Sequence, residues 1–113
     1  MSNKSSPNGG FICEGTLIQG TLRQQDLLRA FASEFERVLP FNSSNLVFEA
    51  RECLAALENN DSEFEGEPVF EAADEIILDL MDELGVIADR EGLYFGAHEG
   101  DGADIGYWAV EMA

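Results

Sequence analysis

The apolar residues between positions 68 and 85 recur at helical spacing more regularly than those of any other segment. Pro68 suits the first position of a helix, because a residue there needs no amide hydrogen for the helical ladder. Gly85 suits the C-terminal cap, where the backbone often adopts a left-handed conformation. A helix with so broad an apolar face buries that face against other elements. The face comprises Val69, Phe70, Ala73, Ile76, Ile77, Leu80, Met81 and Leu84.

Two further helices are predicted upstream of this one. Thr21 and Gln24 have the spacing of a capping box, which starts a helix over about residues 22–39. Pro40 ends that pattern, because proline cannot continue a helical ladder. The apolar residues of a second helix keep helical spacing from Leu46 to Asn59.

Three short strands complete the expected architecture. Residues 11–19 mix apolar and β-branched residues around a glycine, which is typical of a short strand. Residues 93–95 and 105–110 resemble the two arms of a β-hairpin joined by a glycine-rich segment, 96–106. The element order β-α-α-α-β-β predicts an α+β fold in which three helices pack on a small antiparallel sheet.

The length and composition favour one domain in the cytoplasm. A chain of 113 residues with 45% apolar residues is long enough for one core. Residues 11–113 form this domain, whereas residues 1–10 are polar and predict a flexible tail. No apolar run is long enough for a membrane span, and no signal peptide is recognisable. Cys13 and Cys53 are therefore expected to be free thiols, with Cys53 on a buried helical face.

The charge of the chain is concentrated in its second half. The formal net charge is −17. Residues 1–51 carry five acids and five bases, whereas residues 52–113 carry eighteen acids and the single base Arg90. A uniform effect of charge on solubility would not produce this asymmetry, so the downstream half holds the candidate functional surface.

Acidic side chains recur every four residues on the exposed side of the expected helix 68–85. From residue 67 to residue 83 they would form one row of about 24 Å. Each like-charged pair at this spacing costs an isolated helix about 0.2–0.5 kcal/mol. Further acids precede the row in the loop 60–67. The candidate partner-binding residues are Glu67, Glu71, Asp74, Glu75, Asp79, Asp82 and Glu83.

Two hypotheses explain this row. In the first, its spaced carboxylates imitate the phosphates of a nucleic acid and bind a basic protein. In the second, the row is a solvated helix face in an acidic proteome, such as that of a salt-adapted host. Direct binding of nucleic acid is disfavoured in either case, because neutralising phosphates requires clustered Lys and Arg.

The sequence does not predict an enzyme. His98 is the only histidine, and neither cysteine lies in a nucleophile motif. Zinc is disfavoured because paired His and Cys ligands are missing, and no cofactor is expected. The glycine-rich segment does contain carboxylates that suit calcium, although their spacing is not that of an EF-hand loop. The residues of this alternative ligand or metal site are His98, Glu99, Asp101 and Asp104.

Two segments carry a resemblance to known proteins. The run from Phe95 to Trp108 reads FGAHEGDGADIGYW, and the segment from Gly20 to Leu28 reads GTLRQQDLL. Together they resemble small acidic proteins of bacterial mobile elements, namely phages, prophages and plasmids. The resemblance implies a mobile-element setting, and it assigns no activity and no functional residue.

These observations predict a small binding protein of a mobile element. Its acidic helix and loop would contact a basic, nucleic-acid-binding host protein and inhibit it by DNA mimicry. The alternative is a small-ligand or calcium-binding module built on the glycine-rich hairpin, with Tyr94, His98, Tyr107 and Trp108 lining a pocket. Neither the identity of the partner nor the oligomeric state follows from the sequence.

Overall fold

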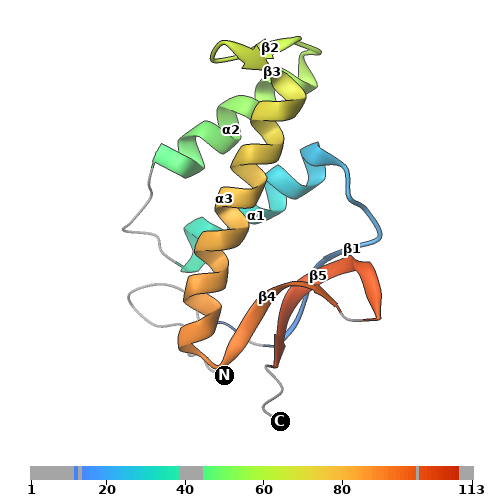
Figure 1. Cartoon of the computed structure of the whole chain (residues 1–113), viewed down its shortest axis with the longest axis vertical. Coiled ribbons are helices and arrows are strands. Elements are labelled where there is room, and N and C mark those ends of the chain that lie inside the picture. Colours follow the sequence, from blue (N-terminus) through green and yellow to red (C-terminus); the bar gives the residue numbers. More distant parts are fainter. Residues whose placement is uncertain (1–11, 13, 39–44, 99, 110–113) are drawn as a thin grey trace.

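Three helices and a three-stranded antiparallel sheet form the α+β fold that the sequence predicts (Figure 1). The computed structural model describes residues 12, 14–38, 45–98 and 100–109. The expected tail 1–10 and the helix-ending Pro40 lie outside these residues. The elements are β1 (Gly15–Gln19), α1 (Gln24–Val38), α2 (Asn45–Glu58), β2 (Glu63–Phe64), β3 (Glu67–Pro68), α3 (Val69–Arg90), β4 (Leu93–His98) and β5 (Asp101–Ala109).

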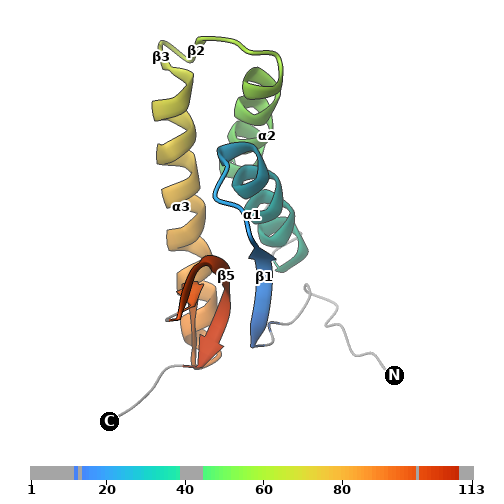
Figure 2. The same ribbon diagram turned by 90° about the vertical axis from the view of Figure 1, so that its right-hand side faces the viewer.

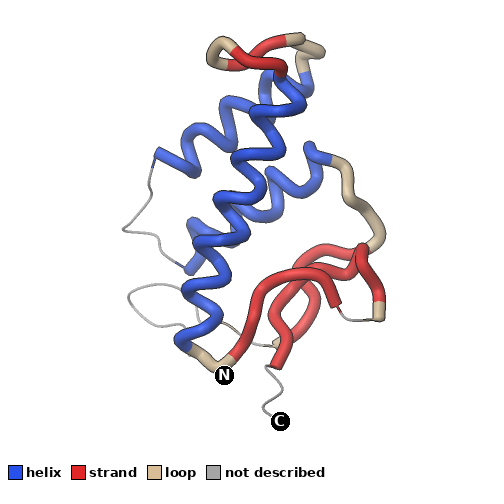
Figure 3. Tube along the Cα trace, viewed as in Figure 1, coloured by secondary structure: helices blue, strands red, loops and turns tan. Residues whose placement is uncertain are grey.

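Helix α3 contacts both the other two helices and the sheet. Figure 2 shows α1 and α2 together along one side of α3, and the sheet beside its C-terminal half. The short β2–β3 hairpin lies at the opposite end of α3, next to α2 (Figure 3). In the part of the chain that the structure describes, no helix combines the length and the apolar character that a membrane span requires.

The strands are ordered β1-β5-β4, so the last strand pairs with the first and lies at the centre. The hairpin that joins β4 to β5 is tighter than the sequence suggests. Residues 96–98 continue β4, and β5 already begins at Asp101, because Gly96 and Gly106 are directly paired in the ladder. The expected glycine-rich joint 96–106 is therefore mostly strand.

A bulge in β1 turns two neighbouring side chains toward α1. Thr16 pairs with Gly106 and Ile18 pairs with Ile105, so Leu17 is the extra residue. The bulge allows the side chains of Leu17 and Ile18 to lie on the same side, toward α1. The backbone of β1 approaches β5 so closely that a Cβ atom at Gly106 would lie 2.1 Å from the carbonyl oxygen of Gly15. Glycine is the residue that this contact requires.

The core lies between the three helices and continues onto one face of the sheet. Phe31 of α1 contacts Phe95 of β4 edge-to-face at a centroid distance of 5.3 Å. Phe95 in turn contacts Tyr107 of β5 at 5.0 Å. These aromatic contacts connect α1 to two strands of the sheet. The largest fully buried side chains are Phe31, Leu28, Leu80, Leu84, Val69 and Cys53, which confirms that Cys53 lies on a core face.

Helix α3 is longer than the sequence suggests. It continues through Gly85 to Arg90, because Ala88 extends the buried face by another turn. The prediction that Gly85 caps the helix is therefore wrong. The left-handed residue that follows the helix is Gly92, with a φ of 75°.

The starts of α1 and α3 also differ from the expectation. Helix α1 begins at Gln24, where the Thr21 hydroxyl accepts a hydrogen bond from the amide of Arg23 and donates one to Asp26. Gln24 does not complete a capping box, because its side chain bonds to α3 instead. Before α3, the expected loop 60–67 contains the β2–β3 hairpin, and Pro68 is the N-cap of α3 rather than its first residue.

Candidate functional site: the acidic surface of α3

Six of the seven candidate partner-binding residues lie on α3 and are exposed. Glu67 differs, because it belongs to β3 and is partly buried. The continuous helical row of about 24 Å that the sequence predicts is therefore shorter. On α3 it extends from Glu71 to Glu83, which is about 18 Å at 1.5 Å per residue.

The exposed side of α3 carries two neighbouring rows of residues at four-residue spacing. The first, which we call the acidic row, contains acidic residues alone. The second, which we call the mixed row, alternates large apolar and acidic residues. The acidic row is Glu71, Glu75, Asp79 and Glu83, and the mixed row is Phe70, Asp74, Leu78, Asp82 and Val86.

The apolar members of the mixed row are exposed. The exposed fraction is 66% for Phe70, 60% for Leu78 and 55% for Val86. The helical pattern predicts Phe70 on the buried face of this helix, and that prediction is wrong. The Gln24 side chain lies at this point, donating hydrogen bonds to the Phe70 carbonyl oxygen at 2.9 Å and to Asp74 at 2.8 Å.

A hollow of about 80 Å³ lies between α2, the β2–β3 hairpin and α3. Carboxylates from all three elements line it, and their shared negative charge favours a cation. Apolar atoms line the remainder and suit the aliphatic stem of a long basic side chain. We call it the acidic hollow; its lining residues are Glu49, Phe64, Glu65, Glu67, Ala72, Glu75, Ile76 and Asp79.

The backbone of the hairpin holds Glu65 at the acidic hollow. Glu65 and Gly66 have φ values of 53° and 86°, as the two central residues of a tight hairpin turn of the primed type require. Cys53 of α2 is buried nearby. Burial, followed by the negative charges of Glu65 and Glu67, raises the pKa of the Cys53 thiol. The negative charge of these carboxylates thus affects a buried group as well as the exposed surface.

The described arginines that form ion pairs do so away from this surface. Arg29 pairs with Glu58 at 2.6 Å, Arg37 pairs with Glu34 at 2.7 Å, and Arg51 pairs with Glu36. Among the described residues, no ion pair includes an acidic side chain of α3. Within the described ranges, the acidic row therefore has no ion-pair partner that offsets its charge.

The alternative site on the β4–β5 hairpin has a different character. His98 accepts a hydrogen bond through Nδ1 from the amide of Gly100 at 2.9 Å, and Asp101 accepts one from the amide of Ala103 at 3.0 Å. Asp104 accepts a hydrogen bond from the Thr16 hydroxyl at 2.6 Å. Each of these side chains thus supports the local backbone or the neighbouring strand.

Three of the four residues of this alternative site, His98, Asp101 and Asp104, are described. Glu99 lies outside the described residues. Over the ranges that the structure describes, no group of three or more His, Cys, Asp and Glu side chains is arranged to hold a metal ion.

The four side chains expected to line a ligand pocket lie on two faces of the sheet. Tyr94 and Trp108 are cross-strand partners, and His98 contacts the Trp108 ring edge-to-face at 4.7 Å. Tyr107 is adjacent to Trp108 in β5, so its side chain lies on the opposite face, where it is buried. These four residues therefore do not surround one pocket.

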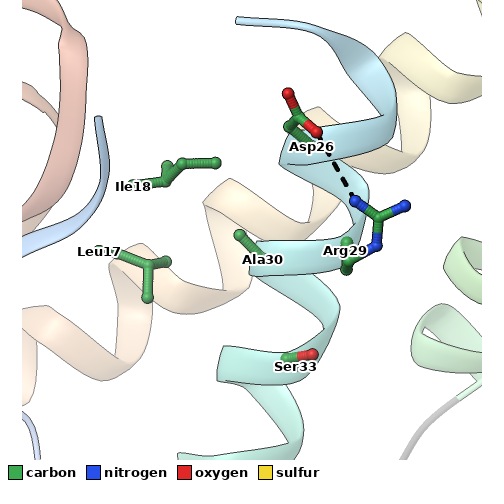
Figure 4. Close-up of a pocket in the computed structure, with 6 residues that line it drawn as sticks. All are labelled: Leu17, Ile18, Asp26, Arg29, Ala30 and Ser33. Carbon is green, nitrogen blue, oxygen red and sulfur yellow. Dashed lines mark ion pairs between the residues drawn. The ribbon is translucent and has the colours of Figure 1, made fainter. Parts of the chain in front are cut away.

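A more open pocket of about 340 Å³ separates β1 from α1 (Figure 4). Leu17, Ile18 and Ala30 line its apolar part. Its charged residues are paired with each other, since Asp26 and Arg29 lie 3.6 Å apart, as the dashed line in Figure 4 marks. Nothing in the sequence pattern indicates this pocket, because it depends on the bulge that turns Leu17 and Ile18 toward the same helix.

No protein-family model matches this sequence, and no curated protein or solved structure shows significant similarity to it. The candidate site is therefore defined by its own residues and their geometry.

Proposed function

We infer that this protein binds a basic host protein through α3 and the β2–β3 hairpin, as an accessory or inhibitory protein of a mobile element. The partner is a nucleic-acid-binding protein, and the acidic surface occupies its phosphate-binding groups by DNA mimicry. One observation carries this proposal. Five carboxylates from three separate elements converge on the acidic hollow, beside an acidic row that forms no ion pair with any described residue.

The energetics support a surface that is completed by a partner. The pairs Glu71–Glu75, Glu75–Asp79 and Asp79–Glu83 each place like charges at four-residue spacing, which destabilises the free helix. Lys and Arg side chains from a partner would replace this repulsion by charge-assisted hydrogen bonds. Attraction between the two surfaces would also accelerate their association.

The proposal includes the setting of the protein. We place it in the cytoplasm, where a buried thiol such as that of Cys53 stays reduced. We assign it no catalytic role and no cofactor. Its partner is a protein rather than a nucleic acid, because the surface repels phosphates.

A pull-down from host lysate tests this proposal. The bait variants are Glu71→Gln, Glu75→Gln and Asp79→Asn combined, which delete three charges of the acidic row while keeping side-chain shape. A matched control deletes three exposed charges elsewhere, as Glu14→Gln, Glu52→Gln and Glu91→Gln combined.

A basic protein retained by wild type and by the control, lost from the acidic-row variant and released by salt, supports the proposal. The competing hypothesis of a solvated helix face predicts equal retention by all three baits. Equal retention would therefore reject the proposed function.

A further inference from the structure

The mixed row contains exposed apolar side chains, which imitation of phosphates does not require. Phosphate groups present charge without apolar side chains, whereas Phe70, Leu78 and Val86 expose more than half of their surface. They alternate with Asp74 and Asp82 at regular four-residue steps. Large apolar side chains placed regularly on an exposed helix indicate a contact that removes them from water.

The row has a definite path over α3. Four residues advance the helix by about 6 Å along its axis and turn it by about 40°. A row at this spacing is inclined by about 26° to the axis, so neighbouring members lie about 6.7 Å apart along the row. From Phe70 to Val86 the row turns by about 160°. A straight partner helix cannot follow such a path, but an extended flexible chain can.

An extended chain matches this spacing. Its residues advance by about 3.3 Å, and alternate side chains point to the same side, so side chains on one side repeat every 6.6 Å or so. An apolar residue, a basic residue and a second apolar residue at alternate positions would thus meet Phe70, Asp74 and Leu78 in order. The same alternation continues to Asp82 and Val86.

Charge selects the kind of chain. A second copy of this protein carries the same net charge of −17, so the two molecules repel each other. An anionic lipid surface repels the acidic surface for the same reason. A segment rich in Lys and Arg is attracted by the mixed row and by the acidic row beside it.

We propose that the mixed row binds an extended basic segment in which apolar residues occur every fourth position and Lys or Arg lies midway between them. This inference rests on the proposed function, because it names the part of the basic partner that this surface recognises. Side chains carry the recognition, since α3 offers no free backbone edge as a sheet would.

Synthetic peptides test the spacing. The probe is a fluorescein-labelled peptide of sequence KSLSKSLSKSLSK, and the control is a peptide of identical composition in which the Leu residues occur every third position. Binding is measured by fluorescence polarisation in low salt, and the site is mapped by NMR shifts of the labelled protein. We expect the probe to bind at least about fivefold more tightly than the control, with shifts along residues 70–86. Equal affinity of the two peptides, which includes no measurable binding of either, would overturn the inference.

Protein variants test the apolar contacts. Phe70→Gln, Leu78→Gln and Val86→Gln keep the charge of the surface. Because these side chains are exposed, the substitutions should not impair folding, which circular dichroism checks. Combined, they should weaken binding of the probe by about tenfold or more. Phe48→Gln is the matched control, because Phe48 is equally exposed, at 65%, but lies on α2. Unchanged affinity in the triple variant contradicts the inference.

The two proposals fail differently. Both peptides could bind wild type equally well and fail to bind the acidic-row variant. That result would support a basic partner and reject the extended recognition pattern. If the acidic-row variant instead binds the lysate partner as wild type does, the proposed function itself falls.

Discussion

The phenol of Tyr107 donates a hydrogen bond of 2.7 Å to Glu34, which lies 73 positions earlier in the chain. Glu34 is buried in α1 and also accepts hydrogen bonds from Arg37 at 2.9 and 2.7 Å. The contact connects the first helix to the central strand of the sheet. It gives the buried carboxylate the partners that such a group requires, because an unpaired charge in the core is costly.

Tyr107→Phe should destabilise the fold by about 1–3 kcal/mol, because it removes one partner of a buried carboxylate. Tyr94→Phe is the control, since Tyr94 is exposed and no hydrogen bond of its hydroxyl is observed among the described residues. Urea unfolding of both variants measures the difference. Equal stabilities would show that solvent or Arg37 replaces the lost hydrogen bond.

The same contact makes stability depend on alkaline pH. Burial, the hydrogen bond to Glu34 and the charge of Glu34 raise the pKa of the Tyr107 phenol far above its ordinary value. Above the ordinary pKa of tyrosine, the folded state therefore keeps this phenol proton, whereas the unfolded state releases it. The contribution is complete below about pH 10, the ordinary pKa of tyrosine, and is lost as the pH rises beyond it.

Melting temperatures between pH 7 and 11 test this dependence. Wild type and Tyr94→Phe should lose more stability above pH 10 than Tyr107→Phe, in which the phenol is gone. Parallel curves for all three proteins would contradict the assignment to Tyr107.

Gly106→Ala should destabilise the protein by about 1–3 kcal/mol or more, because the added carbon would meet the backbone of Gly15, Thr16 and Leu17. Backbone cannot rotate aside as a flexible side chain can. Gly102→Ala is the matched control in the same strand, since no atom lies within 4 Å of its added carbon. Thermal unfolding compares the two variants, and a similar melting temperature would indicate that β1 does not pair with β5 in this register.

The sequence predicts the helices well because their apolar periodicity is a local property. It fails where a neighbour decides the outcome. Phe70 lies at the border of the apolar arc of α3, and only the positions of α1 and α2 determine that it is exposed. Gly85 has the residue type of a cap, but Ala88 continues the buried face, so packing extends the helix past the glycine.

For the same reason, the sequence predicts only part of the candidate site. The acidic row follows from four-residue spacing along one segment. The acidic hollow does not, because Glu49 reaches it from α2 and Glu65 from a tight turn. Their convergence depends on how α2, the hairpin and α3 pack together. The sequence around Glu49 has no pattern that indicates this packing.

Cys53 should be a protected free thiol. It is buried, and burial together with Glu65 and Glu67 raises the pKa of its thiol, so little reactive thiolate forms near neutral pH. Alkylation followed by mass spectrometry should label it slowly in the native protein and rapidly after denaturation. Cys13 lies outside the described residues, and two alkylatable thiols are expected in the denatured protein. A stable disulfide between the two cysteines would contradict both the expected reduced state and the proposed cytoplasmic setting.

Calcium should not stabilise the protein through the β4–β5 hairpin. Asp101 and Asp104 already accept hydrogen bonds from Ala103 and Thr16, as turn and strand contacts. Wild type and the double variant Asp101→Asn, Asp104→Asn should therefore show the same change in melting temperature when calcium replaces sodium at constant ionic strength. A calcium-dependent rise in wild type alone would establish the metal-binding alternative, because a ligand that binds only the folded state stabilises it.

The acidic row should destabilise the free protein. Glu71→Gln, Glu75→Gln and Asp79→Asn together remove the three like-charged pairs between Glu71 and Glu83, which should stabilise the domain by on the order of 1 kcal/mol in low salt. Added salt screens exposed charges, so the gain should shrink toward zero at about 1 M salt. The control variant Glu14→Gln, Glu52→Gln and Glu91→Gln changes the net charge equally without touching the row, and it should gain less. Urea unfolding of the three proteins at both salt concentrations makes the comparison. If the two variants gain equally, the effect belongs to the net charge of −17 and not to the arrangement of carboxylates on α3.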